Sequence, residues 1–135
     1  MGELHKEASK AHRLTEANHE VGMKFDVAQQ GSVTVISLQG SIMGGPDATL
    51  LNSQLHELIT AQKKQVVLDL AGVEFMNSSG LGMLIGGAST LKNAGGKLKL
   101  ANASEKILAL IKITKLTPLF EQYDSVKAAV SSFRS

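Results

Sequence analysis

Two adjacent hydroxyl groups, Ser78 and Ser79, are the residues of this sequence best placed to take part in chemistry. They follow a short apolar segment, Val66–Leu70, and open a stretch with helical periodicity, in which Gly80 and Gly82 leave little bulk around them. We expect Ser78 to be exposed at the start of a helix, where the active site of another protein can reach it. A phosphate attached there would meet backbone N–H groups and the positive end of the helix dipole.

The rest of the domain does not support nucleophilic catalysis by these serines. A Ser-His-Asp arrangement needs a histidine that is oriented by a carboxylate, and after residue 22 the only histidine is His56. His56 falls within an amphipathic pattern, so we expect it on the surface of a helix. The segment Met76–Gly80 resembles a nucleophile elbow only loosely, because Met76 stands where that motif has its first glycine. We therefore predict no catalytic residue.

No cofactor or metal site is predicted either. The glycines within Gly80–Gly86 are spaced one residue too widely for a dinucleotide fingerprint, and Lys97 lacks the neighbours of a phosphate-loop lysine. The chain has no cysteine, which excludes a disulfide framework and a thiolate zinc site. His5, His12 and His19 recur every seven residues, about 10 Å apart along a helix, which is too far for two of them to share one metal ion.

The composition is that of a single globular domain. The 135 residues are 43% hydrophobic and 19% charged, with 2 prolines, which excludes global disorder. A formal charge of +2, 4 phenylalanines, 1 tyrosine and no tryptophan do not favour nucleic-acid binding. The longest strongly apolar stretch, Leu81–Ala88, is too short to span a bilayer, and the charged N-terminus lacks a signal-peptide core. We expect no membrane insertion and a cytoplasmic location.

Hydrophobic periodicity predicts the elements that must position Ser78. Strands are predicted at Phe25–Gln29, Val33–Leu38, Val66–Leu70, Lys97–Ala101 and Leu119–Tyr123. A first helix is predicted from Pro46, with an apolar stripe of Leu51, Leu55, Leu58 and Ile59, and a second helix has the stripe Leu81, Leu84, Ile85, Ala88 and Leu91. Two more helices are predicted, one from Ser104 to Ile111 and one through Val126, Ala129, Val130 and Phe133. We expect Ala71–Asn77 to be a loop, Pro118 to close another, and Lys97–Ala101 to keep one face in water. This order predicts an α/β fold with a mostly parallel central sheet, an antiparallel N-terminal hairpin and about four helices.

Residues 1–22 differ from the rest of the chain. They carry many charges and few apolar side chains, so we place a domain boundary at Gly22 and assign the domain to residues 23–135. We interpret the segment as an N-terminal extension, either a solvated helix, a disordered segment or a sequence added in cloning. A helix that binds a partner is the alternative.

Lysines gather in the last third of the chain: Lys92, Lys97, Lys99, Lys106, Lys112 and Lys115. Two interpretations remain, a basic face for an acidic partner or ordinary solvated surfaces. Because the lysines are spread over several predicted elements, we favour solvated surfaces.

Residues 23–134 resemble the STAS domain family, and specifically the bacterial anti-sigma factor antagonists. The resemblance rests on Val66–Gly82, where a buried strand leads into the sequence Ser-Ser-Gly-Leu-Gly, and on Lys92–Gly96 downstream. It implies a single STAS-like domain that acts as a partner-switching module and not as an enzyme.

In this family a serine kinase that doubles as an anti-sigma factor phosphorylates the first serine of the pair, and the matching residue here is Ser78. The unmodified antagonist binds that kinase, the phosphorylated form releases it, and a serine phosphatase resets the switch. The family often has aspartate before this serine, whereas this chain has Asn77, which keeps a helix cap but brings no charge. The partner-binding surface that the resemblance implies comprises Asn77, Ser79, Gly80, Leu81 and Gly82, together with Gly45 and Asp47.

A second interpretation is a STAS scaffold whose Ser78 is never modified. Such a protein would be a subunit of a signalling assembly or of a lipid-transport complex. The two interpretations differ in whether partner binding responds to a charge at Ser78.

Overall fold

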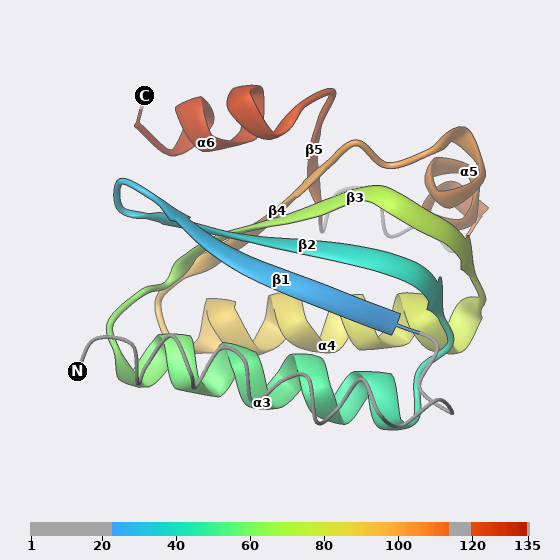
Figure 1. The fold of residues 1–135 in the computed structure, drawn as a ribbon, viewed down its shortest axis with the longest axis horizontal. Coiled ribbons are helices and arrows are strands. Elements are labelled where there is room, and N and C mark those ends of the chain that lie inside the picture. Colours follow the sequence, from blue (N-terminus) through green and yellow to red (C-terminus); the bar gives the residue numbers. More distant parts are fainter. Residues whose placement is uncertain (1–22, 114–119, 135) are drawn as a thin grey trace.

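The computed structural model describes residues 23–113 and 120–134, which form one five-stranded sheet with helices on both faces (Figure 1). The strands are β1 (Met23–Gln30), β2 (Val33–Ile42), β3 (Gln65–Met76), β4 (Lys97–Ala101) and β5 (Glu121–Tyr123). They lie side by side in chain order. β1 and β2 form an antiparallel hairpin, and all other neighbouring strands are parallel. The predicted α/β fold with a mostly parallel sheet is confirmed.

Helices cover the two faces of the sheet unequally. The described helices are α3 (Pro46–Thr60), α4 (Ser78–Asn93), α5 (Glu105–Ile113) and α6 (Val126–Arg134). Parallel neighbours need a crossover connection, and α3 and α4 make two such connections on one face, while α6 lies on the other (Figure 1). The predictions made for residues 1–22 and for the loop at Pro118 lie outside the described residues.

The main hydrophobic core lies between the sheet and the helices α3 and α4. The helix stripes predicted from periodicity are confirmed, since Leu51, Leu55, Leu84 and Leu91 are each at most 1% exposed. They form one cluster with alternate residues of the strands, such as Leu68, because successive side chains of a strand point to opposite faces. This packing fixes the position of α4 beneath the sheet.

The strand that leads to Ser78 is longer than the sequence pattern predicts. β3 continues to Met76, so the prediction of a loop over Ala71–Asn77 was wrong for all but its last residue. Beyond the apolar run, the backbone of β3 keeps pairing with β2, with Met76 beside Ile42, across two shifts in register. A register shift breaks the regular alternation of side chains, and the apolar pattern therefore ends before the strand does.

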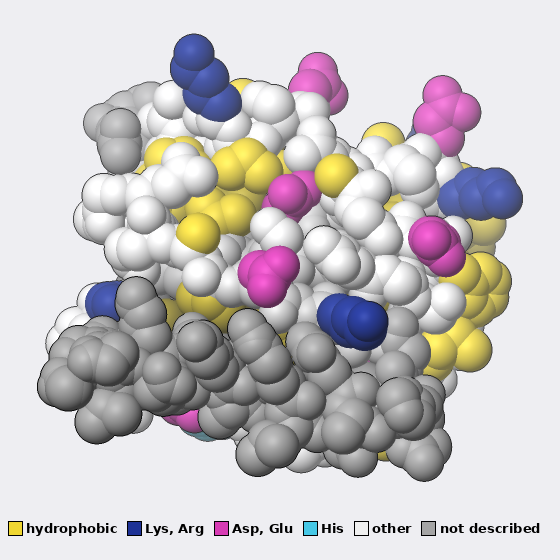
Figure 2. Space-filling model, viewed as in Figure 1, with side chains coloured by type: hydrophobic (Ala, Val, Ile, Leu, Met, Phe, Trp, Pro, Cys, Tyr) yellow, Lys and Arg dark blue, Asp and Glu magenta, His cyan; other side chains and the backbone are white. Residues whose placement is uncertain are grey.

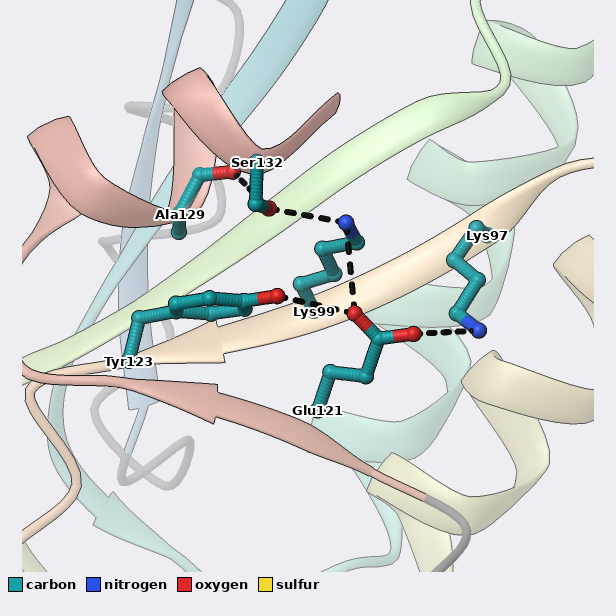
Figure 3. Close-up of polar contacts among 6 residues, drawn as sticks. All are labelled: Lys97, Lys99, Glu121, Tyr123, Ala129 and Ser132. Carbon is teal, nitrogen blue, oxygen red and sulfur yellow. Dashed lines mark hydrogen bonds and ion pairs between the residues drawn. The ribbon is translucent and has the colours of Figure 1, made fainter. Parts of the chain in front are cut away.

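The face of β4 that was expected to be in water is covered by α6 (Figure 3). Lys99 is only 6% exposed, so the prediction of one wet face for Lys97–Ala101 was wrong. The ammonium group of Lys99 donates a 2.8 Å hydrogen bond to the hydroxyl of Ser132 and lies 4.1 Å from the centre of the Phe133 ring. α6 therefore binds the sheet through a buried cation as well as through apolar contacts.

Glu121, the first residue of β5, supplies the negative charge next to this cation. Its carboxylate lies 2.6 Å from Lys97 Nζ and 3.3 Å from Lys99 Nζ, and it accepts a 2.9 Å hydrogen bond from the Tyr123 hydroxyl (Figure 3). The hydrogen bonds from Lys97 and Tyr123 lower the pKa of Glu121 from its ordinary value of 4.5 to about 2. One carboxylate thus links the last two strands of the sheet.

We expect Glu121→Gln to remove an acid-sensitive part of the stability. Because the pKa of Glu121 is lower in the folded protein, its contribution is complete above about pH 4.5 and is lost as the pH falls toward 2. The free energy of unfolding of the wild type should therefore fall more steeply over this range than that of the variant, as measured by urea unfolding at a series of pH values. Glu57→Gln, at an exposed position of α3, should keep the wild-type slope. A wild-type slope in Glu121→Gln would contradict the role of this carboxylate.

Candidate functional site

Ser78 lies at the end of the sheet where the parallel strands β2 and β3 finish and α4 begins. The side chains of Ser78 and Ser79 are both exposed. In open α/β sheets, this carboxyl end of the strands is where binding sites usually form. A modifying enzyme therefore has access to the Ser78 hydroxyl on the surface of the described structure.

Asn77 caps α4, as predicted from its residue type. Its backbone is extended, with φ −104° and ψ −178°, and its Oδ1 accepts a 2.7 Å hydrogen bond from the backbone N–H of Gly80. The backbone carbonyl of Asn77 accepts the N–H of Leu81 at 2.9 Å. These bonds begin the helix at Ser78 and point its positive dipole end toward this serine.

Gly80 and Gly82 have different structural roles, although both were expected to leave little bulk around Ser78. Gly80 is buried, and a Cβ at this position would overlap the carbonyl oxygen of Ile42 and lie 2.7 Å from the carbonyl carbon. Gly82 is exposed, and a Cβ there would meet nothing within 4 Å. Gly80 therefore allows α4 to approach the end of β2, whereas Gly82 leaves an open surface on the first turn of the helix.

The loop between β2 and α3 lies against the first turn of α4. A Cβ at Gly44, whose φ is +84°, would be 3.0 Å from the Cβ of Ser79. Gly45 is exposed, with a φ of +62°. Asp47 is 2% exposed, and its Oδ2 accepts a 3.3 Å hydrogen bond from the backbone N–H of Met43. Asp47 thus holds the shape of this loop from inside.

The structure divides the expected partner-binding residues into two groups. The first group lies at the surface: three residues are exposed, namely Gly45, Ser79 and Gly82, and Asn77 is half-buried. Gly45 belongs to the loop before α3, and the other three belong to the cap and first turn of α4. Three others are buried, namely Asp47, Gly80 and Leu81. Leu81 belongs to the apolar stripe of α4 and packs in the core, so these three lie beneath the exposed residues. The assignment of all seven residues to partner binding stays a prediction.

Sequence reasoning missed an apolar cleft at the end of β3, whose lining includes Met76, two residues before Ser78. It has a volume of about 380 Å³ and lies between the end of β3 and α5, with Phe75, Met76, Ile107, Leu110 and Ile113 in its lining. Phe75 is 51% exposed and Ile113 is 77% exposed. Figure 2 shows hydrophobic side chains at this end of the molecule, at the right of the view. The sequence pattern placed Phe75 in a loop, whereas the continuation of β3 brings this residue beside α5.

The other candidate residues lie as follows. His56 is exposed on α3, as expected, and no group of three metal-ligating side chains occurs in residues 23–113 and 120–134. Lys99 is buried, which removes it from any basic face, and Lys115 lies outside the described residues. Within the described part of the chain, no helix combines the length and apolar character needed to cross a membrane.

Comparison with known proteins gives consistent matches. The STAS domain model matches residues 24–129. The anti-sigma-B factor antagonist of Bacillus subtilis is 31% identical over 101 residues, which cover 75% of this chain and 91% of that protein. An anti-sigma factor antagonist from Mycobacterium paratuberculosis has a similar structure, with a TM-score of 0.72 and 24% identity over 84% of this chain and 95% of that one. The Bacillus cell fate determinant SpoIIAA in its phosphorylated form gives a TM-score of 0.64 and 19% identity over 82% and 99% of the two chains.

We expect Gly80→Ala to destabilise the protein and Gly82→Ala to leave it at least as stable as the wild type. The methyl group at residue 80 must displace the Ile42 carbonyl, and overpacking of this kind costs about 1–3 kcal/mol. At residue 82 the methyl group faces open space, and alanine gains about 0.5–1 kcal/mol of helix propensity. Urea unfolding measures both free energies. Equal stabilities of the two variants would contradict the close approach of α4 to β2.

Proposed function

Because the chain belongs to the STAS domain family, we propose that it is an anti-sigma factor antagonist whose binding is switched by phosphorylation of Ser78. In its unmodified form it binds an anti-sigma factor that is also a serine kinase. That kinase phosphorylates Ser78 and is then released, and a serine phosphatase restores the unmodified form. The observation that carries this proposal is the exposed hydroxyl of Ser78 at the first turn of α4.

The relatives support a role in partner binding. The Bacillus subtilis relative is named an anti-sigma-B factor antagonist, and a relative from Paenibacillus polymyxa is named an anti-sigma F factor antagonist. SpoIIAA, whose fold this chain shares, exists in a phosphorylated form. This chain is proposed to have both properties, with Ser78 as the phosphorylated residue.

The surroundings of Ser78 suit a phosphate group. Ser78 is the first residue of α4 and therefore lies at the positive end of the helix dipole, which stabilises negative charge. Asn77 completes the cap without adding a carboxylate, so the residue before Ser78 does not repel the phosphate. Ser78 then acts as the acceptor in a reaction that the partner kinase catalyses, and the proposed protein is a binding module without enzymatic activity of its own. The role places it in the cytoplasm.

A phosphate at Ser78 acts locally. It adds a charge of about −1.5 to −2, which at most balances the formal charge of +2 of the whole chain. One unit charge about 5 Å from an acidic group of the partner costs roughly 3 kcal/mol at an effective dielectric constant of about 20. This corresponds to about two orders of magnitude in affinity. Release of the partner therefore needs no rearrangement of the fold.

We expect Ser78→Asp to weaken binding of the anti-sigma factor about 100-fold, since it places one permanent charge at the interface. Wild-type protein and the variants would be used to capture partners from a lysate of the source organism, with identification by mass spectrometry and affinities measured on the purified partner. Ser78→Ala should bind like the wild type but should not be phosphorylated by that partner with ATP.

Ser89→Asp is the matched control, because it adds the same charge to an exposed position far along α4. It should bind like the wild type. Equal binding by wild type, Ser78→Ala and Ser78→Asp would contradict the switch and favour the unmodified scaffold. Failure of the wild type to bind any anti-sigma factor would contradict the proposed function itself.

A further inference from the structure

We propose that the cleft between β3 and α5 is a second part of the surface that binds the anti-sigma factor, and that it receives an amphipathic helix of that partner. This inference rests on the proposed function and adds to it the chemistry of the partner segment. The β3–α5 cleft is formed by Glu74, Phe75 and Met76 on β3 and by Ser104, Lys106, Ile107, Ala109, Leu110 and Ile113 in and beside α5.

Exposed apolar side chains are concentrated around this cleft. Four large hydrophobic residues are exposed in the part of the chain that the structure describes, and two of them, Phe75 and Ile113, line the cleft. A third, Met43, directly follows Ile42 of β2, which pairs with the cleft residue Met76. Exposed apolar surface gathered at one end of a small domain marks an interaction site.

The sequence of α5 is more apolar than its packing requires. Ile107 and Ile111 are buried and attach the helix to the core. Leu110 is half-buried, and Ile113 projects into solvent. A helix that needed only to cover the core would be polar on its outer face. The additional apolar residues of α5 are explained if a partner packs against them.

The charges at the cleft specify the kind of helix that it accepts. Glu74 stands on the β3 wall and Lys106 on the α5 wall, both exposed, and neither forms an ion pair with another described residue. A partner helix that presents an apolar stripe, with an acidic residue toward Lys106 and a basic residue toward Glu74, complements both walls. The volume of about 380 Å³ accommodates apolar side chains that anchor such a helix.

The cleft and Ser78 are close enough for one partner to contact both. Met76 lines the cleft, Asn77 caps α4, and Ser78 follows directly. The apolar surface of the cleft is then the same in the unmodified and phosphorylated forms, while the adjacent contact at Ser78 changes with phosphorylation. The partner helix in the cleft contributes most of the binding free energy, and a phosphate at Ser78 weakens the complex as a whole.

The test measures binding of the purified anti-sigma factor, recovered as described for the proposed function, by isothermal titration calorimetry. We expect Phe75→Ala and Lys106→Glu each to weaken binding at least about tenfold, because one removes an aromatic anchor and the other reverses a complementary charge. Val27→Ala and Lys63→Glu are matched controls at exposed positions away from the cleft, and both should bind like the wild type. Thermal unfolding confirms that each variant is folded.

A second measurement reports on the cleft directly. The chain has no cysteine, so Ile113→Cys provides a single site for an environment-sensitive fluorophore. Its emission should shift to the blue when the partner binds, and the same label on Val27→Cys should not respond. Wild-type affinity in Phe75→Ala and Lys106→Glu, or equal losses in the variants and their controls, would overturn the cleft while the proposed function stands. If no anti-sigma factor binds the wild type, the proposed function fails, and the cleft assignment fails with it.

Discussion

Helix α4 begins where it does because nothing larger than a hydrogen atom projects from Gly80 toward the end of β2. The carbonyl of Ile42 occupies the place that a side chain would take. This contact seats the first turn of α4 against the sheet, and the bond from Gly80 to Asn77 fixes the residue at which the helix starts. The exposure of Ser78 and the neighbouring position of the β2–α3 loop both depend on it.

The site therefore combines a rigid support with a small variable element. Buried residues such as Asp47 and Leu81 hold the loop and the helix from inside, and the exposed residues above them contribute little more than backbone and hydroxyl groups. Binding to a surface of this kind costs little conformational entropy, because few side chains need to be ordered. In the proposed function, bulk or charge added to this surface weakens partner binding, which is the property that a covalent switch needs.

Local pattern was sufficient to predict the hairpin, the helix stripes and the cap at Asn77, since each depends on residues near one another in the chain. It failed where distant segments meet. The continuation of β3 depends on pairing with β2, the burial of Lys99 depends on α6, and the exposure of Phe75 depends on both the strand and α5. The alternating sequence of β4 predicted a strand with one solvent-exposed face, because the sequence does not distinguish a lysine that is buried against a distant helix from one that is exposed.

The order of the strands in the sheet also has a consequence for how the chain reaches its native state. Each strand lies beside the one that precedes it in the sequence, so no strand must wait for a later one before it can pair. Each new strand therefore has to close only one connection, onto the strand that precedes it, and the entropic cost of closure rises only slowly with the length of that connection. The sheet can therefore extend strand by strand from the β1–β2 hairpin, and α6 covers Lys99 once β4 and β5 are in place.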